Sequence, residues 1–163
     1  MLLSKICKFQ EGYVNPSQKN QNFFNGEIKW VRANDVNYLP IFNTSRTLSQ
    51  IGFQSAGKSA VLFKPNTIVI TKSGTIGRVA IIKDFMCGNR AIINIETITN
   101  NNIDTKYIYY WLYSNSEYLN SIAVGSVQKN LYISILGNID LPWPSFEQKQ
   151  HIVNIKEKIY AKC

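Results

Sequence analysis

Between residues 60 and 95, short runs of β-branched and aliphatic residues alternate with turn residues, and this pattern constrains the fold more than any other part of the chain. Four runs follow one another, at residues 60–63, 67–71, 79–82 and 91–95. They are separated by Lys64-Pro65-Asn66, by the glycine-containing segment 74–77 and by Gly88-Asn89. Runs of this length, bounded by Gly, Pro and Asn, are typical of strands. The spacing therefore predicts a compact sheet folded on itself.

The first third of the chain is expected to consist mainly of loops. Residues 10–27 are rich in Asn, Gln, Gly, Pro and Ser, and residues 43–59 are polar with several Ser and Thr. Such composition is typical of loops, and we expect one short strand within the second loop. Between the two loops, residues 27–31 predict a strand, and Asn34-Asp35 predicts a turn or a helix cap.

A helix is predicted from about residue 106 to residue 116, with Asp104 or Thr105 as its N-cap. The apolar residues that fall on one helical face are Ile108, Trp111, Leu112 and, further on, Leu119. The aromatic run that begins at Tyr107 also fits a strand, so both alternatives stay open here.

The last segment predicts a second helix, which follows a rigid linker. Leu141-Pro142-Trp143-Pro144 is expected to be extended, because proline does not fit a helix interior. Ser145 then caps the helix, with Gln148 as its capping-box partner. One face of the helix carries a stripe that consists of Gln148, Ile152, Ile155 and Ile159. We expect this stripe to bind a partner helix; the alternative is that it packs on the domain's own core.

The charge of the chain favours a polyanionic partner. Lys and Arg number 18 and Asp and Glu number 10, for a formal charge of +8 and a pI near 9.4. Such an excess is typical of nucleic-acid-binding domains, although many basic globular proteins bind nothing anionic. The basic residues are scattered rather than gathered on one amphipathic helix, which disfavours a membrane surface. No apolar run approaches the ~20 residues of a membrane span and no signal peptide is visible, so a cytoplasmic protein is expected.

The residues needed for catalysis or metal binding are scarce, so we expect no enzyme and no metal site. The three cysteines lie far apart and form no CxxC pair, and the chain has a single histidine, His151. No Walker sequence and no G-x-G-x-x-G motif occurs. The nearest approach to an amino-methyltransferase motif, Asn15-Pro16-Ser17-Gln18, fails at its third and fourth positions.

Several polar segments carry side chains suited to DNA. Segment 72–78 presents donors on a turn that needs Gly74 and Gly77 for its geometry, and segment 125–131 is polar between apolar flanks. Gln and Asn can bond adenine, and Lys and Arg can bond guanine or phosphate. For each segment the alternative is an ordinary solvated turn; for 72–78 a KH-type RNA-binding loop is disfavoured, because β-branched runs flank it. The candidate DNA-binding residues are Arg32, Asn34, Lys58, Lys72, Ser73, Thr75, Arg78, Asn89, Arg90, Ser126, Gln128, Lys129 and Asn130.

The order of these segments resembles the specificity subunits of type I restriction–modification systems. The resemblance lies in ICKFQEGY from residue 6, GEIKWVRANDV from 26, KPN from 64, IVITKSGTIGRVAI from 68, NRAI from 89, YIYYWL from 107, GSVQKNL from 125 and LPWPSFEQKQHI from 141. Each motif is weak alone, but their order covers nearly the whole chain. Two features depart from the family: Arg90 stands where Gln is more common, and the family usually has two recognition domains and two long helices.

The resemblance implies an α+β fold: a compact, mostly β target-recognition domain with packed helices at residues 1–144, then the start of a conserved spacer helix at 145–163. It implies a chain that reads one half of a split double-stranded DNA target and pairs with itself or with a second half-subunit through that helix. The implied partners are methyltransferase subunits, which would carry S-adenosylmethionine, and a restriction subunit. The alternatives are a small nucleic-acid-modifying enzyme and a basic protein-interaction module without sequence preference.

Overall fold

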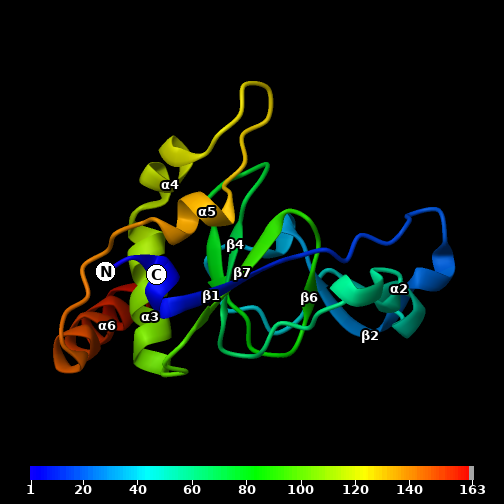
Figure 1. Ribbon diagram of the computed structural model, residues 1–163. Coiled ribbons are helices and arrows are strands. Elements are labelled where there is room, and N and C mark those ends of the chain that lie inside the picture. Colours follow the sequence, from blue (N-terminus) through cyan, green and yellow to red (C-terminus); the bar gives the residue numbers. More distant parts are fainter. Residues whose placement is uncertain (162–163) are drawn as a thin grey trace.

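The structure of the chain, a computed structural model, describes residues 1–161 as two small sheets flanked by helices (Figure 1). This mixture confirms the expected α+β class. The helices, 3-10 helices and strands are, in chain order, α1 (Leu3–Ile6), β1 (Cys7–Glu11), η1 (Gln21–Phe23), β2 (Phe24–Val31), η2 (Ala33–Asp35), β3 (Arg46–Leu48), α2 (Gln50–Gln54), η3 (Gly57–Ser59), β4 (Ile68–Thr71), β5 (Val79–Ile81), β6 (Cys87–Gly88), β7 (Ile92–Thr97), α3 (Asn102–Ser114), α4 (Ser116–Ile122), α5 (Ile133–Gly137) and α6 (Phe146–Tyr160).

The larger sheet is antiparallel and has the strand order β1-β7-β4-β5. Every residue of β4 is buried, because both faces of this strand are covered. Ile68 and Ile70 point to the core under the helices, whereas Val69 points to a second core on the other face. Three of the four β-branched runs, 67–71, 79–82 and 91–95, are thereby confirmed as strands.

The smaller sheet has the order β3-β2-β6, with β2 antiparallel to β3 and parallel to β6. The strand predicted at residues 27–31 is confirmed and begins earlier, at Phe24. A buried cluster connects this sheet to the larger one, since it includes Val31 of β2 together with Val69 of β4 and Ile92 of β7. The chain thus forms three layers: helices, the four-stranded sheet and the three-stranded sheet.

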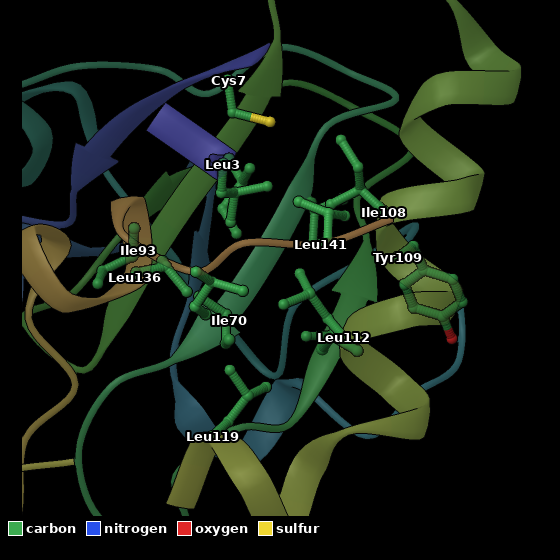
Figure 2. Close-up of a cluster of buried hydrophobic side chains, with 14 of the residues drawn as sticks. Leu3, Cys7, Ile70, Ile93, Ile108, Tyr109, Leu112, Leu119, Leu136 and Leu141 are labelled. Carbon is green, nitrogen blue, oxygen red and sulfur yellow. The ribbon is translucent and has the colours of Figure 1, made fainter. Parts of the chain in front are cut away.

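The helix α3 covers the outer face of the larger sheet (Figure 1). Figure 2 shows Ile108 and Leu112 of α3 directed toward Ile70 of β4, with Leu136 of α5 and Leu141 of the extended linker closing the same core. All five side chains are buried. The predicted helical alternative for the aromatic run is therefore correct, and the strand alternative is wrong.

The final helix α6 packs along α3 and is anchored by a buried ion pair. Lys149 Nζ lies 2.5 Å from Asp104 Oδ1, and the two side chains are only 6% and 5% exposed. The Lys149 ammonium also lies 3.6 Å from the centre of the Trp143 ring, and Thr99 donates a hydrogen bond to the second oxygen of Asp104. The capping box between Ser145 and Gln148 is present as predicted. These contacts determine which face of α6 turns inward.

Several expectations were wrong in detail. Residues 60–63 form no strand, and only Phe63 makes an isolated bridge, to Met86. The helix α3 begins at Asn102 and is capped by Asn101, whose side chain accepts a bond from the amide of Ile103; Asp104 instead serves the ion pair. Leu119 belongs to the separate short helix α4. The strands β1 and β6 were not predicted from the sequence.

The polar region 43–59 holds more structure than a loop with a single strand. It contains β3 as expected, but also the helical turn α2 and the 3-10 helix η3. Ser49 caps α2, since its side chain accepts a bond from the amide of Gly52. Within residues 1–161, no helix has both the length and the apolar composition required to cross a membrane.

The Lys149–Asp104 pair gives a direct test of this packing. We expect Lys149→Met to lower the free energy of unfolding by about 3–5 kcal/mol, because it leaves the buried Asp104 carboxylate without its partner. The double variant Lys149→Met/Asp104→Asn removes the stranded charge and is expected to recover part of this loss. Urea denaturation measures both, with Lys158→Met on the exposed side of α6 as the control. A loss for Lys149→Met no larger than that of the control would contradict this role.

Candidate nucleic-acid interface

A tight turn follows β4 and carries the first group of candidate residues. Gly74 and Gly77 have positive φ angles of 74° and 88°, as predicted for glycines required by the turn. Thr71 fastens the base of the turn, since its hydroxyl accepts a bond from the amide of Arg78 and donates one to the carbonyl of Thr75. The turn therefore holds its polar side chains on a well-defined backbone.

The polar segment 125–131 forms the tip of a hairpin that joins this turn. The amides and carbonyls of Val124 and Asn130 pair in both directions, at 2.9 and 2.8 Å. Gly125 has a φ of 140°, and a Cβ there would lie 2.2 Å from the carbonyl oxygen of Gln128, so the tip requires glycine. In Figure 1 the hairpin projects beyond the rest of the molecule. Ser126, Gln128 and Lys129 are exposed at its tip.

The hairpin and the turn are held together by backbone contacts. The amide of Leu131 donates to the carbonyl of Lys72 at 2.8 Å, and Ser73 forms a bridge with Asn130. The amide of Lys72 donates in turn to the carbonyl of Ala91, at 2.8 Å. Segments that lie far apart in the sequence are thus adjacent at one end of the larger sheet.

Asn89 and Arg90 lie next to the same turn. The amide of Asn89 donates to the carbonyl of Val31, and the Asn89 side chain accepts from the amide of Ala91. The side chain of Asn15, in the first loop, accepts from the amide of Arg90. Arg90 itself is exposed. Asn89 is therefore occupied in shaping the backbone, whereas the Arg90 guanidinium is accessible to a ligand.

Arg32, Asn34 and Arg78 meet around the 3-10 helix η2. The Arg78 guanidinium donates to the carbonyl of Ala33 at 2.9 Å. Arg32 and Asn34 both donate to the hydroxyl of Ser45, at 3.0 and 3.5 Å. Within the described residues, the Nε atoms of both arginines are buried and have no hydrogen-bond partner. The Arg32 guanidinium lies over the Trp30 ring, with 5.1 Å between the guanidinium carbon and the ring centre, and this ring helps to bury the Arg32 Nε atom.

Two of the candidate lysines are not available as free cations at this junction, Lys72 because of an ion pair and Lys58 because of its position. Lys72 Nζ lies 3.2 Å from Glu11 Oε1, and the side chains are 17% and 20% exposed, so its charge is already compensated by a neighbour. Lys58 lies in η3, just after α2, and Figure 1 places α2 far from the turn and the hairpin. The structure therefore brings together the candidates from residues 32–34, 72–78, 89–90 and 126–130, but not Lys58.

The resulting surface offers cations and amides rather than catalytic groups. Arg90 and Lys129 are exposed cations, and Arg32 and Arg78 are partly exposed. No cluster of three His, Cys, Asp or Glu residues suited to a metal ion occurs in the described part of the chain. Burial raises the pKa of the Cys7 and Cys87 thiols to about 12, so both stay protonated at neutral pH. Guanidinium, ammonium and amide donors of this kind suit phosphates and base edges.

Sequence reasoning missed the residues that support this surface. Glu11 compensates Lys72, Asn15 holds the backbone at Arg90, and Ser45 binds both Arg32 and Asn34. Each of these contacts joins residues at least 11 positions apart. Such residues carry no local sequence signal, because their role depends on which distant segment lies next to them.

The chain is similar to known specificity subunits in sequence and in fold. The chain is 30% identical over 149 residues to the type I restriction enzyme MjaIX specificity subunit of Methanocaldococcus jannaschii, which covers 88% of this chain and 34% of that protein. A second similar protein is a solved structure described as showing complex assembly and conformational transition of the type I R-M system. The match covers 99% of this chain and 38% of that chain, with a TM-score of 0.76 at 14% identity. The match to the crystal structure of the HsdS subunit of Thermoanaerobacter tengcongensis covers 99% of this chain and 37% of that chain, with a TM-score of 0.70 at 15% identity.

The chain spans about a third of the length of these relatives. The two structural likenesses, at identities this low, establish the fold alone. The model of the type I restriction modification DNA specificity domain matches residues 2–163, which is nearly the whole chain. The chain therefore belongs to the type I restriction modification DNA specificity domain family.

Proposed function

We propose that this chain reads a DNA sequence, as the specificity component of a type I restriction–modification system, and performs no chemistry itself. The observation that carries the proposal is the junction of the turn at 72–78, the hairpin at 124–130 and segment 89–91, which backbone hydrogen bonds hold at one end of the sheet. These segments supply Arg90, Gln128 and Lys129, whose side chains suit phosphates and base edges. The MjaIX relative is named a specificity subunit, which agrees with this role.

The proposed DNA surface divides into contacts of two kinds. Arg32 and Arg78 are held by hydrogen bonds to Ser45 and Ala33, and such fixed guanidinium groups suit the DNA backbone, where position matters more than base identity. Ser126, Gln128 and Lys129 sit at the exposed hairpin tip, which can enter a groove and contact base edges. Lys72 contributes less in this arrangement because Glu11 already pairs with it, and Lys58 contributes less because it lies far from the turn and the hairpin.

The second part of the proposal concerns assembly. A single recognition domain reads one half of a split target, so the chain would pair with itself or with a second half-subunit through residues 145–163. Part of the predicted stripe on α6 supports this role, because Gln148, Ile155 and Ile159 are exposed, Ile155 to 45% and Ile159 to 53%. Ile152 instead is half-buried and packs against the domain's own core. Methyltransferase subunits, which would carry S-adenosylmethionine, and a restriction subunit would complete the assembly.

Selection from a random duplex pool, followed by sequencing, tests the proposal as a whole. We expect a short motif to be enriched, and to appear as two separated halves if the chain pairs with itself. The selection should be run with and without the methyltransferase subunit. Salt-sensitive binding without an enriched motif in both conditions would contradict sequence reading and leave a basic interaction module.

Lys129→Ala tests the hairpin tip. If Lys129 contacts a phosphate, the variant binds all duplexes more weakly, and the slope of log affinity against log salt falls by ~0.9. If Lys129 contacts a base, discrimination at one target position falls by about 1–3 kcal/mol. Fluorescence anisotropy at several salt concentrations measures both effects, with Lys158→Ala on α6 as the control. If the affinity, the salt slope and the specificity were all unchanged, Lys129 would lie outside the interface.

Ile155→Asp tests the pairing surface of α6. A charge in an apolar helix interface is left without a partner, so we expect the dissociation constant of self-association to rise at least about tenfold. Analytical ultracentrifugation measures the change, with the exposed Asn154→Asp on the same helix as the matched control. Equal effects of the two variants would show that Ile155 lies outside the pairing surface.

A further inference from the structure

A pocket of about 310 Å³ opens beside the junction of α3 and α6, and the function proposed above does not use it. Half of its lining residues are tyrosines, namely Tyr38, Tyr109, Tyr110, Tyr113 and Tyr160. A cavity of roughly 150 Å³ suffices to hold a benzene ring. The pocket therefore has room for one aromatic side chain together with a polar group beside it.

The rings of this pocket are held in place by one another. Tyr110 stacks on Tyr160 with 5.7 Å between ring centres and an interplanar angle of 5°, and Tyr113 lies 4.7 Å from the same Tyr160 ring. Tyr109 is a buried member of the core, and in Figure 2 its hydroxyl points away from the labelled core side chains. This hydroxyl donates a hydrogen bond to the carbonyl of Tyr38. A wall fixed in this way loses little side-chain entropy when a ligand enters.

Tyr38 is held in a strained conformation at the edge of the pocket. Its φ is 66°, in the left-handed region that bulky residues rarely adopt. In this conformation the carbonyl of Tyr38 accepts the hydrogen bond from Tyr109, and the ring centres of Tyr38 and Tyr113 lie 4.6 Å apart. A backbone conformation of this kind costs about 1–3 kcal/mol, and residues that adopt one are often found at binding sites. Here it presents the Tyr38 ring and the next residue, Leu39, at the opening.

The charge at the pocket selects for an anion. Its lining includes Lys83 and Lys106 and no carboxylate. Lys106 is paired with Glu157 at 2.6 Å, whereas Lys83 has only a hydrogen bond to the Asn66 side chain, at 3.2 Å, and no ion pair within residues 1–161. Phenol faces alone would attract a cation, but the Lys83 ammonium disfavours one. An aromatic group with a carboxylate next to it suits both features.

An apolar side chain borders the pocket, and the pocket lies away from the proposed DNA surface. Leu39 lines the pocket and is 69% exposed, so a partner that enters the pocket can also cover it. Lys83 follows β5, whereas Arg78 and the turn precede it, so the pocket and the DNA surface lie at opposite ends of this strand. A protein bound at the pocket would leave the hairpin and the turn accessible.

We propose that this pocket docks an acidic peptide segment of the methyltransferase subunit. An aromatic side chain of that segment inserts between the tyrosine rings, and a neighbouring carboxylate pairs with Lys83. Leu39 packs on the outside of the inserted residue. The proposal rests on the assembly proposed above, but it concerns a surface distinct from both the DNA-binding loops and the exposed stripe of α6.

Two variants with matched controls test the docking site. We expect Leu39→Asp and Lys83→Glu each to weaken binding to the purified methyltransferase subunit at least about tenfold, because the first places a charge on an apolar contact and the second repels the carboxylate of the partner. The exposed Ile51→Asp on α2 and Lys19→Glu in the first loop change the same residue types elsewhere, and they should bind like the wild type. Isothermal titration calorimetry without DNA measures the affinity, and circular dichroism confirms that each variant folds.

The outcomes separate this proposal from the proposed function. Wild-type affinity of both Leu39→Asp and Lys83→Glu would overturn the docking site while leaving DNA reading intact. A change in self-association in place of methyltransferase binding would also overturn it, since the pocket would then serve a second copy. Failure of the wild-type chain to bind the methyltransferase subunit would overturn both the docking site and the assembly proposed above, while DNA reading would be unaffected. Loss of DNA binding by the wild type would instead contradict the proposed function, which anisotropy with the selected duplex measures separately.

Discussion

The buried ion pair between Lys149 of α6 and Asp104 of α3 is the contact on which the arrangement of the helices depends. A buried charge is stable only when it is paired and hydrogen-bonded, and here Trp143 and Thr99 complete the surroundings of the pair. The pair fixes the rotation of α6, so that Val153 faces the core and Ile155 faces outward. It also brings Tyr160 to Tyr110, which closes the aromatic pocket.

The larger sheet separates the surfaces to which we assign different roles. At one end of β5, the turn and the hairpin share backbone hydrogen bonds and present the cations proposed to meet DNA. At the other end, Lys83 lies beside the tyrosine pocket. Because β4 is fully buried between two cores and β5 and β7 are mostly buried, this sheet is a firm scaffold that positions the loops relative to one another. The proposed DNA and protein contacts therefore involve different residues.

Local patterns predicted the elements that have local causes. The strands β4, β5 and β7 follow from β-branched runs between turn residues, and the capping box of Ser145 and Gln148 follows from two residues three positions apart. The expectation failed where a tertiary contact overrides the pattern. Residues 60–63 have strand-like composition, but only Phe63 finds a backbone partner. Asp104 looks like a helix cap, yet its carboxylate is drawn to Lys149, and Asn101 caps α3 instead.

For the candidate site, the sequence by itself determined which segments are polar, which turns need glycine and which family the chain resembles. These properties reside in short stretches of chain, where spacing and backbone preference act directly. Only the tertiary structure decided that Lys72 is neutralised by Glu11, that Lys58 lies apart, and that Arg78 meets Ala33. The physical reason is that hydrogen bonds and ion pairs act over a few ångströms. The partners of a side chain are therefore set by the packing of distant segments, which no local pattern encodes.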